Sequence, residues 1–431
     1  MASKDSKIVI VGSGTFGCST ALHLARQGYT NVLCLDKYPV PSPISAGNDI
    51  NKIVDIVEDT VEDAPDERLQ KEAVELWRKD PVFSPYFHEV GVIVSAVHDE
   101  PLEDMHKLNE RRKKHGMAPL KYLSSPEDFR QEIPALTGPL TNWKGYKLGS
   151  EGGWVHARKA LENAAREAEK LGVRFQSGAD GDVKSLKIEN GKCVGVETHS
   201  GKTVYADRVV LSAGANTVLL TDFKGQLEAK CFTLAHIKLT PEENAKLKNT
   251  PVMFNYEKGF FFEADEDRSE MKICNEFPGY TNLNESGESV PVARHEIPLE
   301  AEQGVRDYLR ETIPEFADKE FVKARICWCT DSPDRNLILT THPDHDNVVL
   351  ATGDSGRSYV LIPVVGKYIA KVATDGTQAL SEQDRHQWRW RPETASSRDD
   401  QQGRWGGSGK VSDLKDIHDW TNINWDKSSQ L

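Results

Sequence analysis

Lys7-Ile8-Val9-Ile10-Val11-Gly12-Ser13-Gly14-Thr15-Phe16-Gly17-Cys18 is the stretch that decides the fold. A short apolar run passes into a complete GxGxxG pattern. A helical segment follows at 19–26, and a second apolar run at 32–35 ends in Asp36. This order of strand, glycine-rich turn, helix, strand and acid predicts a dinucleotide-binding βαβ unit over residues 1–37.

Each residue of this pattern has a physical role. Gly12 permits the tight turn, Gly14 lets the backbone approach a pyrophosphate, and Gly17 lets helix and strand pack closely. The start of the helix offers N–H groups and a partial positive charge to phosphates. Asp36 comes 24 residues after Gly12 and can accept hydrogen bonds from a ribose 2′-OH.

Composition excludes several classes of function. The chain of 431 residues has a formal net charge of −13, which argues against nucleic acid or an anionic membrane as partner. No apolar run is long enough to span a bilayer, and the N-terminus has no hydrophobic signal core. The seven cysteines fit reduced thiols, and none has zinc spacing, so we expect no metal. We expect a cytoplasmic or peroxisomal protein, because Ser429-Gln430-Leu431 resembles a peroxisomal address without its basic middle residue.

Two further buried strands favour a flavin over a nicotinamide. The runs at 208–214 and 347–353 both end in small residues, so something must approach their carboxyl ends closely. A sheet made from three separated segments, with a substrate domain inserted between them, suits the extended FAD molecule. At the second glycine turn, the amides of 356–358 would lie at a helix N-terminus and could stabilise negative charge on a reduced flavin.

The predicted fold class is therefore α/β. We expect a Rossmann-like FAD-binding domain with an inserted α+β substrate domain built on an antiparallel sheet. The FAD-binding domain would comprise residues 1–80, 150–225 and 325–378, and the substrate domain residues 81–149 and 226–324. Residues 379–431 would form a C-terminal wrap.

Several motifs beyond the fingerprint resemble one family. The chain is similar over nearly all its length to the fungal amadoriases, the fructosyl amino acid or fructosyl peptide oxidases, within the monomeric sarcosine oxidase family. The motifs that carry the resemblance are 12–17, Ser45-Ala46-Gly47-Asn48-Asp49-Ile50-Asn51-Lys52-Ile53, Gly259-Phe260-Phe261-Phe262-Glu263, Lys272-Ile273-Cys274-Asn275-Glu276-Phe277-Pro278-Gly279, Cys327-Trp328-Cys329-Thr330, Gly353-Asp354-Ser355-Gly356-Arg357 and Trp388-Arg389-Trp390-Arg391-Pro392.

The resemblance implies an FAD enzyme that oxidises the C–N bond of a secondary amine to an imine. The imine hydrolyses to amino acid and glucosone, and O2 reoxidises the flavin to give H2O2. By position, Cys327 matches the cysteine that links to the flavin, with Cys329 as the second choice. Lys272 matches the active-site lysine that holds a water near flavin N5. Glu276 matches the carboxylate that binds the sugar hydroxyls, and Arg404, or else Arg391, matches the arginine that holds the fructosyl part.

The resemblance also implies the residues that bind the cofactor. The loop 38–56 would pass along the flavin ring, which makes Lys52 a candidate contact. The full set of expected cofactor contacts is Gly12, Gly14, Thr15, Phe16, Gly17, Asp36, Lys37, Ser45, Lys52, Val183, Ala213, Gly214, Asp354, Gly356, Arg357, Ser358 and Tyr359.

Two departures from the family concern the substrate. Val360 stands where relatives usually carry a lysine that pairs with the substrate carboxylate, a contact worth about 1.5–3 kcal/mol. The stretch 55–67 is acidic where relatives often carry arginines. We therefore keep open a fructosyl-lysine-like or cationic substrate, or another N-substituted amine such as saccharopine, an N-methyl amino acid or a specialised metabolite. A non-catalytic flavoprotein and, more distantly, a nicotinamide dehydrogenase are also kept open. The expected partners are a small amine and O2, and we expect a monomer.

Overall fold

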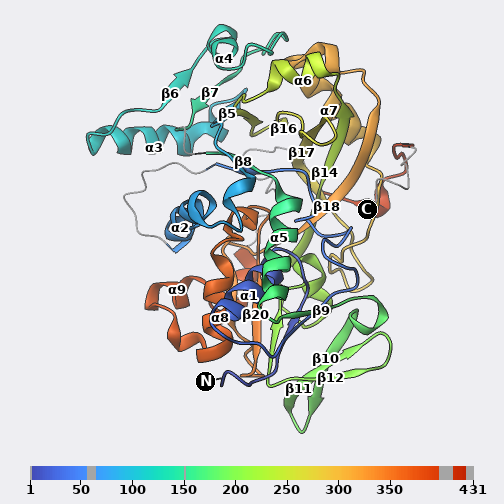
Figure 1. Ribbon diagram of the computed structural model, residues 1–431. Helices are drawn as coiled ribbons and strands as arrows, with labels where there is room; N and C mark the ends of the chain where they lie inside the picture. Colours follow the sequence, from blue (N-terminus) through green and yellow to red (C-terminus); the bar gives the residue numbers. More distant parts are fainter. Residues whose placement is uncertain (1, 56–64, 150–151, 398–410, 424–431) are drawn as a thin grey trace.

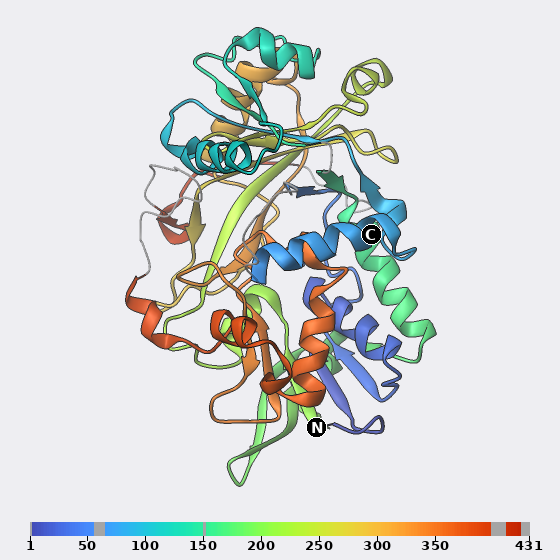
Figure 2. The same ribbon diagram turned by 90° about the vertical axis from the view of Figure 1, so that its left-hand side faces the viewer.

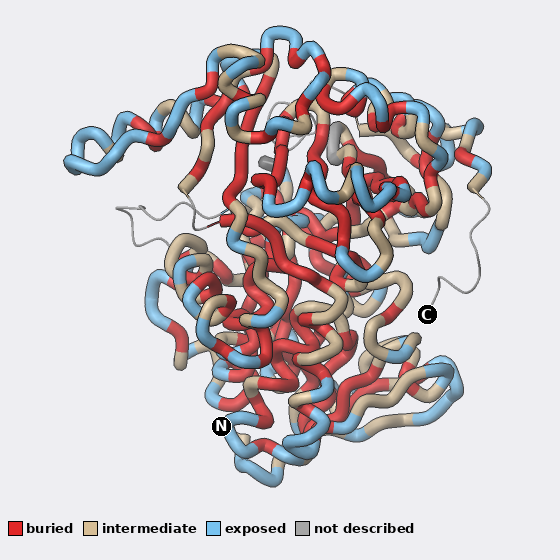
Figure 3. Tube along the Cα trace, turned by 45° about the horizontal axis from the view of Figure 1, so that its top comes forward, coloured by how far each residue is buried: buried red, intermediate tan, exposed pale blue. Residues whose placement is uncertain are grey.

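The computed structural model describes residues 2–55, 65–149, 152–397 and 411–423. Figure 1 shows two parts, one above the other. The lower part is built on a six-stranded sheet and the upper part on a nine-stranded sheet. In Figure 3 the buried segments run through the middle of both parts, and the exposed segments lie at their edges.

The six-stranded sheet brings together three distant segments of the chain. Its order is β19-β20-β13-β1-β2-β9, and all its neighbours are parallel except β19 and β20. The strands are β1 (Ile8–Val11), β2 (Val32–Leu35), β9 (Arg174–Gln176), β13 (Arg208–Leu211), β19 (Ile338–Thr341) and β20 (Val348–Thr352). The predicted Rossmann-like sheet, with the segments near 210 and 350 beside the first βαβ unit, is confirmed.

Alternating side chains bury both faces of this sheet. Ile8 and Ile10 face a core shared with helices, whereas Val9 and Val11 face a smaller antiparallel sheet. The helices that contribute to the first core are α1 (Thr15–Arg26), α2 (Pro65–Lys79), α5 (Ala157–Lys170) and α8 (Val365–Asp375). The smaller sheet contains β10 (Val183–Glu189), β11 (Lys192–Thr198) and β12 (Thr203–Tyr205). Figure 2 shows α2 crossing the middle of the molecule between the two main sheets.

The upper part has the expected antiparallel sheet. Its order is β18-β14-β17-β16-β15-β5-β7-β6, with β21 beside β17. The strands are β5 (Val92–Ala96), β6 (Lys121–Leu123), β7 (Lys144–Lys147), β14 (Glu228–Lys238), β15 (Val252–Asn255), β16 (Gly259–Phe261), β17 (Glu270–Thr281), β18 (Phe321–Asp331) and β21 (Ser412–Asp413). The helices of this part are α3 (Glu103–Lys114), α4 (Pro126–Glu132), α6 (Pro241–Leu247) and α7 (Leu299–Thr312). Two pairs in the sheet, β5–β15 and β17–β21, are parallel.

The faces of the nine-stranded sheet differ in chemistry. Met271 and Ile273 of β17 pack into an apolar core with α7. Lys272 and Cys274 of the same strand point to the opposite face, because side chains alternate along a strand. This second face is turned toward the lower part of the molecule and carries the site described below.

A fourth sheet and the C-terminal segment connect the two parts. The fourth sheet contains β3 (Lys52–Val54), β4 (Phe87–His88) and β8 (Gly153–Val155). Trp388, just after α9 (Glu382–Gln387), is fully buried in the core of the lower part, while β21 joins the upper sheet. The domain boundary that we expected at residue 325 falls inside β18, which stays in the upper sheet as far as Asp331.

Within the described residues, no helix has both the length and the apolar character needed to cross a membrane.

Candidate active site

One continuous cavity of about 470 Å³ connects the two parts of the molecule. At its lower end it is lined by the glycine-rich turn after β1 and by Asp36 after β2. At its upper end it is lined by Phe260, Cys274 and Cys327 of the nine-stranded sheet. The cavity therefore has one end suited to a dinucleotide and another on the inner face of the antiparallel sheet.

The three glycines of the fingerprint have different surroundings. A Cβ on Gly12, whose φ is +95°, would lie 2.5 Å from the carbonyl oxygen of Ser212, and one on Gly17 would lie 1.8 Å from that of Gly12. Both positions therefore exclude any side chain. A Cβ on Gly14 would meet only the Ser45 hydroxyl, at 3.3 Å, so the backbone at Gly14 is open to the cavity. This is the arrangement that lets a pyrophosphate approach the main chain.

The acid at the end of β2 is held in place by the main chain. The Ser13 N–H donates to Oδ2 of Asp36 at 2.8 Å, and the Tyr38 N–H donates to Oδ1 at 3.1 Å. Burial raises the pKa of Asp36, and these hydrogen bonds from Ser13 and Tyr38 oppose the rise. The carboxylate lines the cavity with acceptor capacity for the ribose of a dinucleotide.

Most of the predicted cofactor contacts lie on the wall of this cavity. Those that line it are Gly12, Gly14, Thr15, Phe16, Asp36, Lys37, Ser45, Lys52, Val183, Ala213, Gly214, Asp354, Gly356, Ser358 and Tyr359. Two members of the predicted set are elsewhere. Gly17 packs against Gly12 behind the turn, and Arg357 pairs with Asp66 at 3.0 Å and donates to the carbonyl of Arg335.

The second glycine turn differs from the expectation in one respect. Asp354 anchors the turn, since its carboxylate accepts from the Thr330 N–H, the Thr330 hydroxyl and the Gly356 N–H. The segment that follows is a short 3₁₀ helix, Ser358–Leu361, and α8 begins only at Val365. We expected the amides of 356–358 to lie at the start of an α-helix. The structure places them before α8, so they are not at the positive end of an α-helix dipole. Pro363 lies between the turn and α8 and provides no N–H for a continuous helix.

The two neighbouring cysteines of β18 have different environments. Cys327 is partly exposed and lines the cavity opposite Phe232 of β14. Cys329 is buried, and its thiol donates to the carbonyl of Lys230 at 3.3 Å and to Asp331 at 3.5 Å. Both cysteines line the cavity, and Cys327 is the less buried residue of the two.

Lys272 lies just beyond the upper end of the cavity and is 1% exposed. Its Nζ donates to Oδ2 of Asp49 at 2.8 Å and to the carbonyl of Asn51 at 2.7 Å. The rings of Phe262 and Phe260 lie 5.0 and 6.0 Å from the ammonium group. Lys272 thus extends from the upper sheet to the loop that precedes β3.

A second lysine shares the same carboxylate. Nζ of Lys52 lies 3.0 Å from Oδ2 of Asp49, and Lys52 lines the cavity. Burial alone would lower the pKa of Lys52, but the Asp49 carboxylate more than compensates and raises it. Burial would likewise raise the pKa of Asp49, but Lys272, Lys52 and Arg325 hold it well below its usual range. Asp49 and Lys52 are therefore both charged at neutral pH, and the ammonium group of Lys272 shares the same anion.

Arg325 holds the same loop from the neighbouring strand β18. Its guanidinium donates to the carbonyl of Asn48 at 3.0 Å and to those of Pro43 and Ser45 at 3.4 Å. A second buried ion cluster lies beside it, where Glu270 accepts from His236 at 2.9 Å and from Lys323 at 3.2 Å. Burial lowers the pKa of His236, so its ring is neutral at pH 7. Among these groups four cations accompany two carboxylates, which leaves the upper end of the cavity positive.

Among the predicted substrate residues, Val360 and Arg391 are the two whose side chains the structure describes. The side chain of Glu276 and all of Arg404 lie outside the described residues, as do positions 56–64 of the acidic stretch. Val360 is buried in the core of the lower part and is not on the cavity wall, and its carbonyl accepts from the Trp77 indole at 2.7 Å. The Val360 side chain therefore does not contact the cavity or a substrate within it.

Arg391 is placed where it holds the protein together. It is 1% exposed, and its Nε and Nη2 donate to the two oxygens of Asp334 at 2.9 and 2.7 Å. It also donates to the carbonyls of Leu337, Arg389 and Asn336. Its second-choice role as a fructosyl ligand is corrected accordingly, because these contacts use its donors and the residue does not line the cavity.

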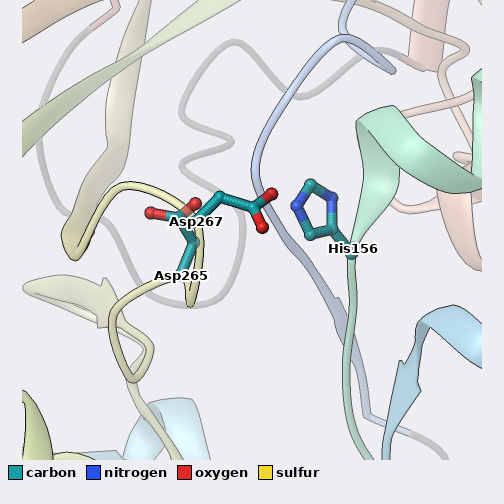
Figure 4. Close-up of side chains that lie close together, drawn as sticks. All are labelled: His156, Asp265 and Asp267. Carbon is teal, nitrogen blue, oxygen red and sulfur yellow. The ribbon is translucent and has the colours of Figure 1, made fainter.

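Figure 4 shows His156, Asp265 and Asp267, whose possible ligand atoms lie within 4.8 Å of one another. Other contacts already use this cluster. Lys159 lies 2.6 Å from Asp267, and Asp265 accepts the N–H groups of Arg268 and Glu270. Nδ1 of His156 is buried without a hydrogen-bond partner, whereas a ligating histidine normally donates from its second nitrogen. The geometry therefore favours an ion-pair contact between the two parts over a metal site.

Sequence reasoning missed two residues of the site, Asp49 and Arg325. Asp49 lies within a motif that carried the family resemblance, but nothing in its neighbourhood indicates that it faces Lys272, which is 223 residues away. Arg325 occupies an alternate position on the same strand as Cys327, so strand periodicity could have placed the two on one face.

The comparisons with known proteins agree with this geometry. Residues 7–372 match the model of the FAD dependent oxidoreductase family. The chain is 31% identical over 414 residues to L-saccharopine oxidase of Schizosaccharomyces pombe, covering 90% of this chain and 94% of that protein.

Solved structures are similar over the full length. Fructosamine oxidase (Amadoriase II) of Aspergillus fumigatus in complex with FSA has 44% identity and a TM-score of 0.93, with 100% of both chains covered. Amadoriase I of the same fungus has 42% identity and a TM-score of 0.91, with 99% of both chains covered.

Proposed function

The chain belongs to the family of FAD-dependent oxidoreductases, and we propose on that premise that it is an amadoriase-type oxidase of fructosyl amino acids. In this reaction the C–N bond of the secondary amine gives up two electrons and becomes an imine. Water hydrolyses the imine to the free amino acid and glucosone, and O2 takes up the electrons as H2O2.

One observation carries the proposal. A single cavity joins the dinucleotide fingerprint to the face of the antiparallel sheet that bears Cys327 and, just beyond, Lys272. A nicotinamide enzyme needs no such extension into a second sheet. The similar structures of amadoriases I and II over the full chain point to the same chemistry.

The residues present fit FAD. The open backbone at Gly14 suits the pyrophosphate, and the fixed carboxylate of Asp36 suits the ribose of the adenosine half. The positive upper end of the cavity suits the flavin, which when bound supplies a two-electron acceptor. Fixed cations at that end would favour its reduced, anionic form.

The roles of individual side chains follow from their contacts. Nζ of Lys272 donates to the Asp49 carboxylate and the Asn51 carbonyl, which fixes the ammonium group beside the upper end of the cavity, and there it would hold a water near the flavin, as the resemblance implies. Its fixed charge would stabilise the negative charge that develops as O2 accepts electrons. Cys327 would form a thioether to the cofactor, because it is the less buried of the two cysteines that line the cavity and the Cys329 thiol donates to the carbonyl of Lys230. Glu276 and Arg404 would bind the sugar, as the resemblance implies.

A second candidate is an oxidase of another N-substituted amino acid. The identity to L-saccharopine oxidase favours it. Saccharopine itself carries several carboxylates, and the positive end of the cavity could accept them. The finer features are also part of the proposal: a covalent flavin, H2O2 as product, deglycation as the outcome, a monomer, and a cytoplasmic or peroxisomal location.

Anaerobic mixing with substrates tests the function directly. Fructosyl-valine, Nε-fructosyl-lysine, saccharopine and sarcosine are each added to the purified flavoprotein, and loss of flavin absorbance is followed. Rapid reduction by a fructosyl compound supports the amadoriase assignment, and reduction by saccharopine alone supports the alternative. If none of the amines reduces the flavin, both oxidase proposals fail. Lys272→Met should leave this reduction within about threefold of the parent and slow the subsequent reaction with O2.

A further inference from the structure

Asp49 has a nearly buried carboxylate, and the proposed function assigns it no role in the reaction. Its side chain is 2% exposed. One oxygen, Oδ2, accepts from the ammonium groups of both Lys272 and Lys52, at 2.8 and 3.0 Å. The other oxygen accepts from the N–H of Ile50 at 2.9 Å. The backbone on either side is fixed as well, since the Asp49 carbonyl accepts from the Arg158 N–H at 2.8 Å.

The two lysines depend on this anion in different ways. Lys272 is buried, and its Nζ is held in place by the Asp49 carboxylate and the Asn51 carbonyl. Lys52 faces the cavity, and its flexible stem needs a fixed acceptor to hold Nζ in one place. Glu270, the other buried carboxylate nearby, is engaged with His236 and Lys323. Asp49 is thus the carboxylate that contacts Lys272 among the described residues.

We propose that Asp49 is a positioning residue that acts through Lys272 and Lys52: it fixes both ammonium groups at the flavin end of the cavity and keeps Lys52 charged, so that O2 reduction depends on Asp49. In that step O2 takes up two electrons and one proton from the anionic reduced flavin and a second proton from water, and becomes H2O2, while Asp49 gains and loses nothing. The inference rests on the proposed function, from which it takes the role of Lys272.

Other titratable groups face this trio from the surrounding elements. Arg325 of β18 and His236 of β14 act on Asp49, Cys327 and Cys274 act on Lys52, and Tyr359 lies near Asp49 on the lower side. His236 is neutral at pH 7 and Arg325 is always charged. Asp49 is therefore the group whose removal would change the charge state of Lys52 and release the ammonium group of Lys272 from its fixed position.

Asp49→Asn keeps the shape of the side chain and removes its charge. The reduced variant should react with O2 at least tenfold more slowly than the parent at pH 8, while anaerobic reduction by substrate changes less than threefold. The parent rate should be constant from pH 6 to 9. In the variant it should fall as pH rises, because a lysine without its anion loses its proton at lower pH. Asp49→Glu keeps the charge but displaces it, so its O2 reaction should be slowed three- to tenfold with a flat pH profile.

A second readout needs no flavin. Flavin-free protein is treated with a limiting amount of acetic anhydride at pH 8, and acetylation of the peptide that contains Lys52 is measured by mass spectrometry. Only the neutral amine reacts, so Asp49→Asn should raise the rate at Lys52 at least tenfold.

Asp80→Asn is the matched control. Asp80 is also buried and pairs with an arginine, Arg26, at 2.7 Å, but it lies away from the cavity wall. It should change neither the O2 reaction nor the acetylation of Lys52.

The outcomes separate this inference from the proposed function. If Lys272→Met slows the O2 reaction and Asp49→Asn affects neither readout, the role of Asp49 is wrong and the oxidase assignment stands. If Lys272→Met leaves the O2 reaction unchanged, the role of Lys272 fails and this inference fails with it. If Asp49→Asn does not fold, Asp49→Glu decides: a parental O2 rate with parental Lys52 reactivity overturns the proposal.

Discussion

The backbone N–H of Ser13 donates a 2.8 Å hydrogen bond to Oδ2 of Asp36, which ties the glycine-rich turn to the acid that follows the next strand. Ser13 lies in the turn that follows β1, and Asp36 follows β2. Asp36 lines the lower end of the cavity, as do Gly12 and Gly14 on either side of Ser13. This hydrogen bond thus fixes the glycine-rich turn and Asp36 relative to each other without a ligand. The contribution of Asp36 to FAD binding can be tested directly.

Asp36→Ala should weaken FAD binding. A hydrogen bond to an ionised group contributes about 1.5–3 kcal/mol, so the Kd should rise roughly 10- to 100-fold. The measurement uses a Cys327→Ala background, in which binding would be reversible, and follows quenching of flavin fluorescence. Asp207→Ala is the control, because Asp207 also accepts a main-chain N–H, from Lys7, but lies outside the cavity. An unchanged Kd for Asp36→Ala would remove Asp36 from the cofactor site.

Cys327→Ala should release all of the flavin when the protein is denatured in acid, whereas Cys329→Ala should retain it on the chain. The reason is accessibility, since the Cys329 thiol is buried and donates to the carbonyl of Lys230. Mass spectrometry of the yellow peptide from the parent identifies the attachment residue. Flavin attached to Cys329 would contradict the assignment to Cys327. Release of the flavin from the parent protein in acid would show that the cofactor is not covalently bound.

Glu270 should contribute stability that is lost in acid. Burial alone would raise its pKa, but contacts with His236 and Lys323 lower it to about 2 in the folded protein, against 4.5 for the ordinary side chain. A carboxyl whose folded pKa is depressed stabilises the protein above pH 4.5, and this contribution disappears as pH falls toward 2. Unfolding midpoints in urea between pH 7 and 3 should therefore fall less steeply for Glu270→Gln than for the parent. The exposed Glu285→Gln should follow the parent curve, and identical slopes for all three would contradict the prediction.

Arg391→Met should destabilise the protein without changing substrate affinity. The buried guanidinium donates to the carbonyls of Leu337, Arg389 and Asn336 as well as to the partly exposed Asp334, and leaving those buried acceptors without a donor should cost about 1–3 kcal/mol. Urea unfolding measures the loss, and Asp334→Asn in the same background should recover part of it. A raised KM for fructosyl substrates at unchanged stability would return Arg391 to the substrate site.

Val360→Lys should be destabilising by at least about 2 kcal/mol, because an ammonium group would enter an apolar core. Val360→Met provides the control for added length without charge. The two variants are compared by thermal unfolding and by kcat/KM for fructosyl-valine. A stable Val360→Lys variant with improved kcat/KM would show that the lysine reaches the cavity and binds the substrate carboxylate.

Local patterns were sufficient for the elements that bind the dinucleotide. The fingerprint at 12–17 encodes its own geometry, since the space at Gly12 and Gly17 admits no side chain. The apolar runs near 210 and 350 predicted buried strands, and both lie in the six-stranded sheet. The amides of 356–358, expected at the N-terminus of the helix that follows the second glycine turn, lie ahead of it, because α8 begins only at Val365, after Pro363.

Local sequence patterns could not predict which distant segments of the chain contact one another. Arg391 and Arg325 are both arginines in or beside the recognisable motifs. In the structure, Arg391 donates to the Asp334 carboxylate, whereas Arg325 donates to backbone carbonyls of the loop at 43–48. No local spacing distinguishes a buried structural arginine from a substrate ligand, because the side chain is long and its partner lies elsewhere in the chain.

The sequence by itself determined the FAD-binding architecture and the chemical family, because glycine positions and strand periodicity are local constraints on the backbone. Only the tertiary structure decided that one oxygen of Asp49 serves both Lys272 and Lys52. That meeting requires the loop before β3 to lie against the inner face of β17, an arrangement set by the packing of two sheets. A buried charge is stable only beside its counter-charges, and where these lie is a property of the fold.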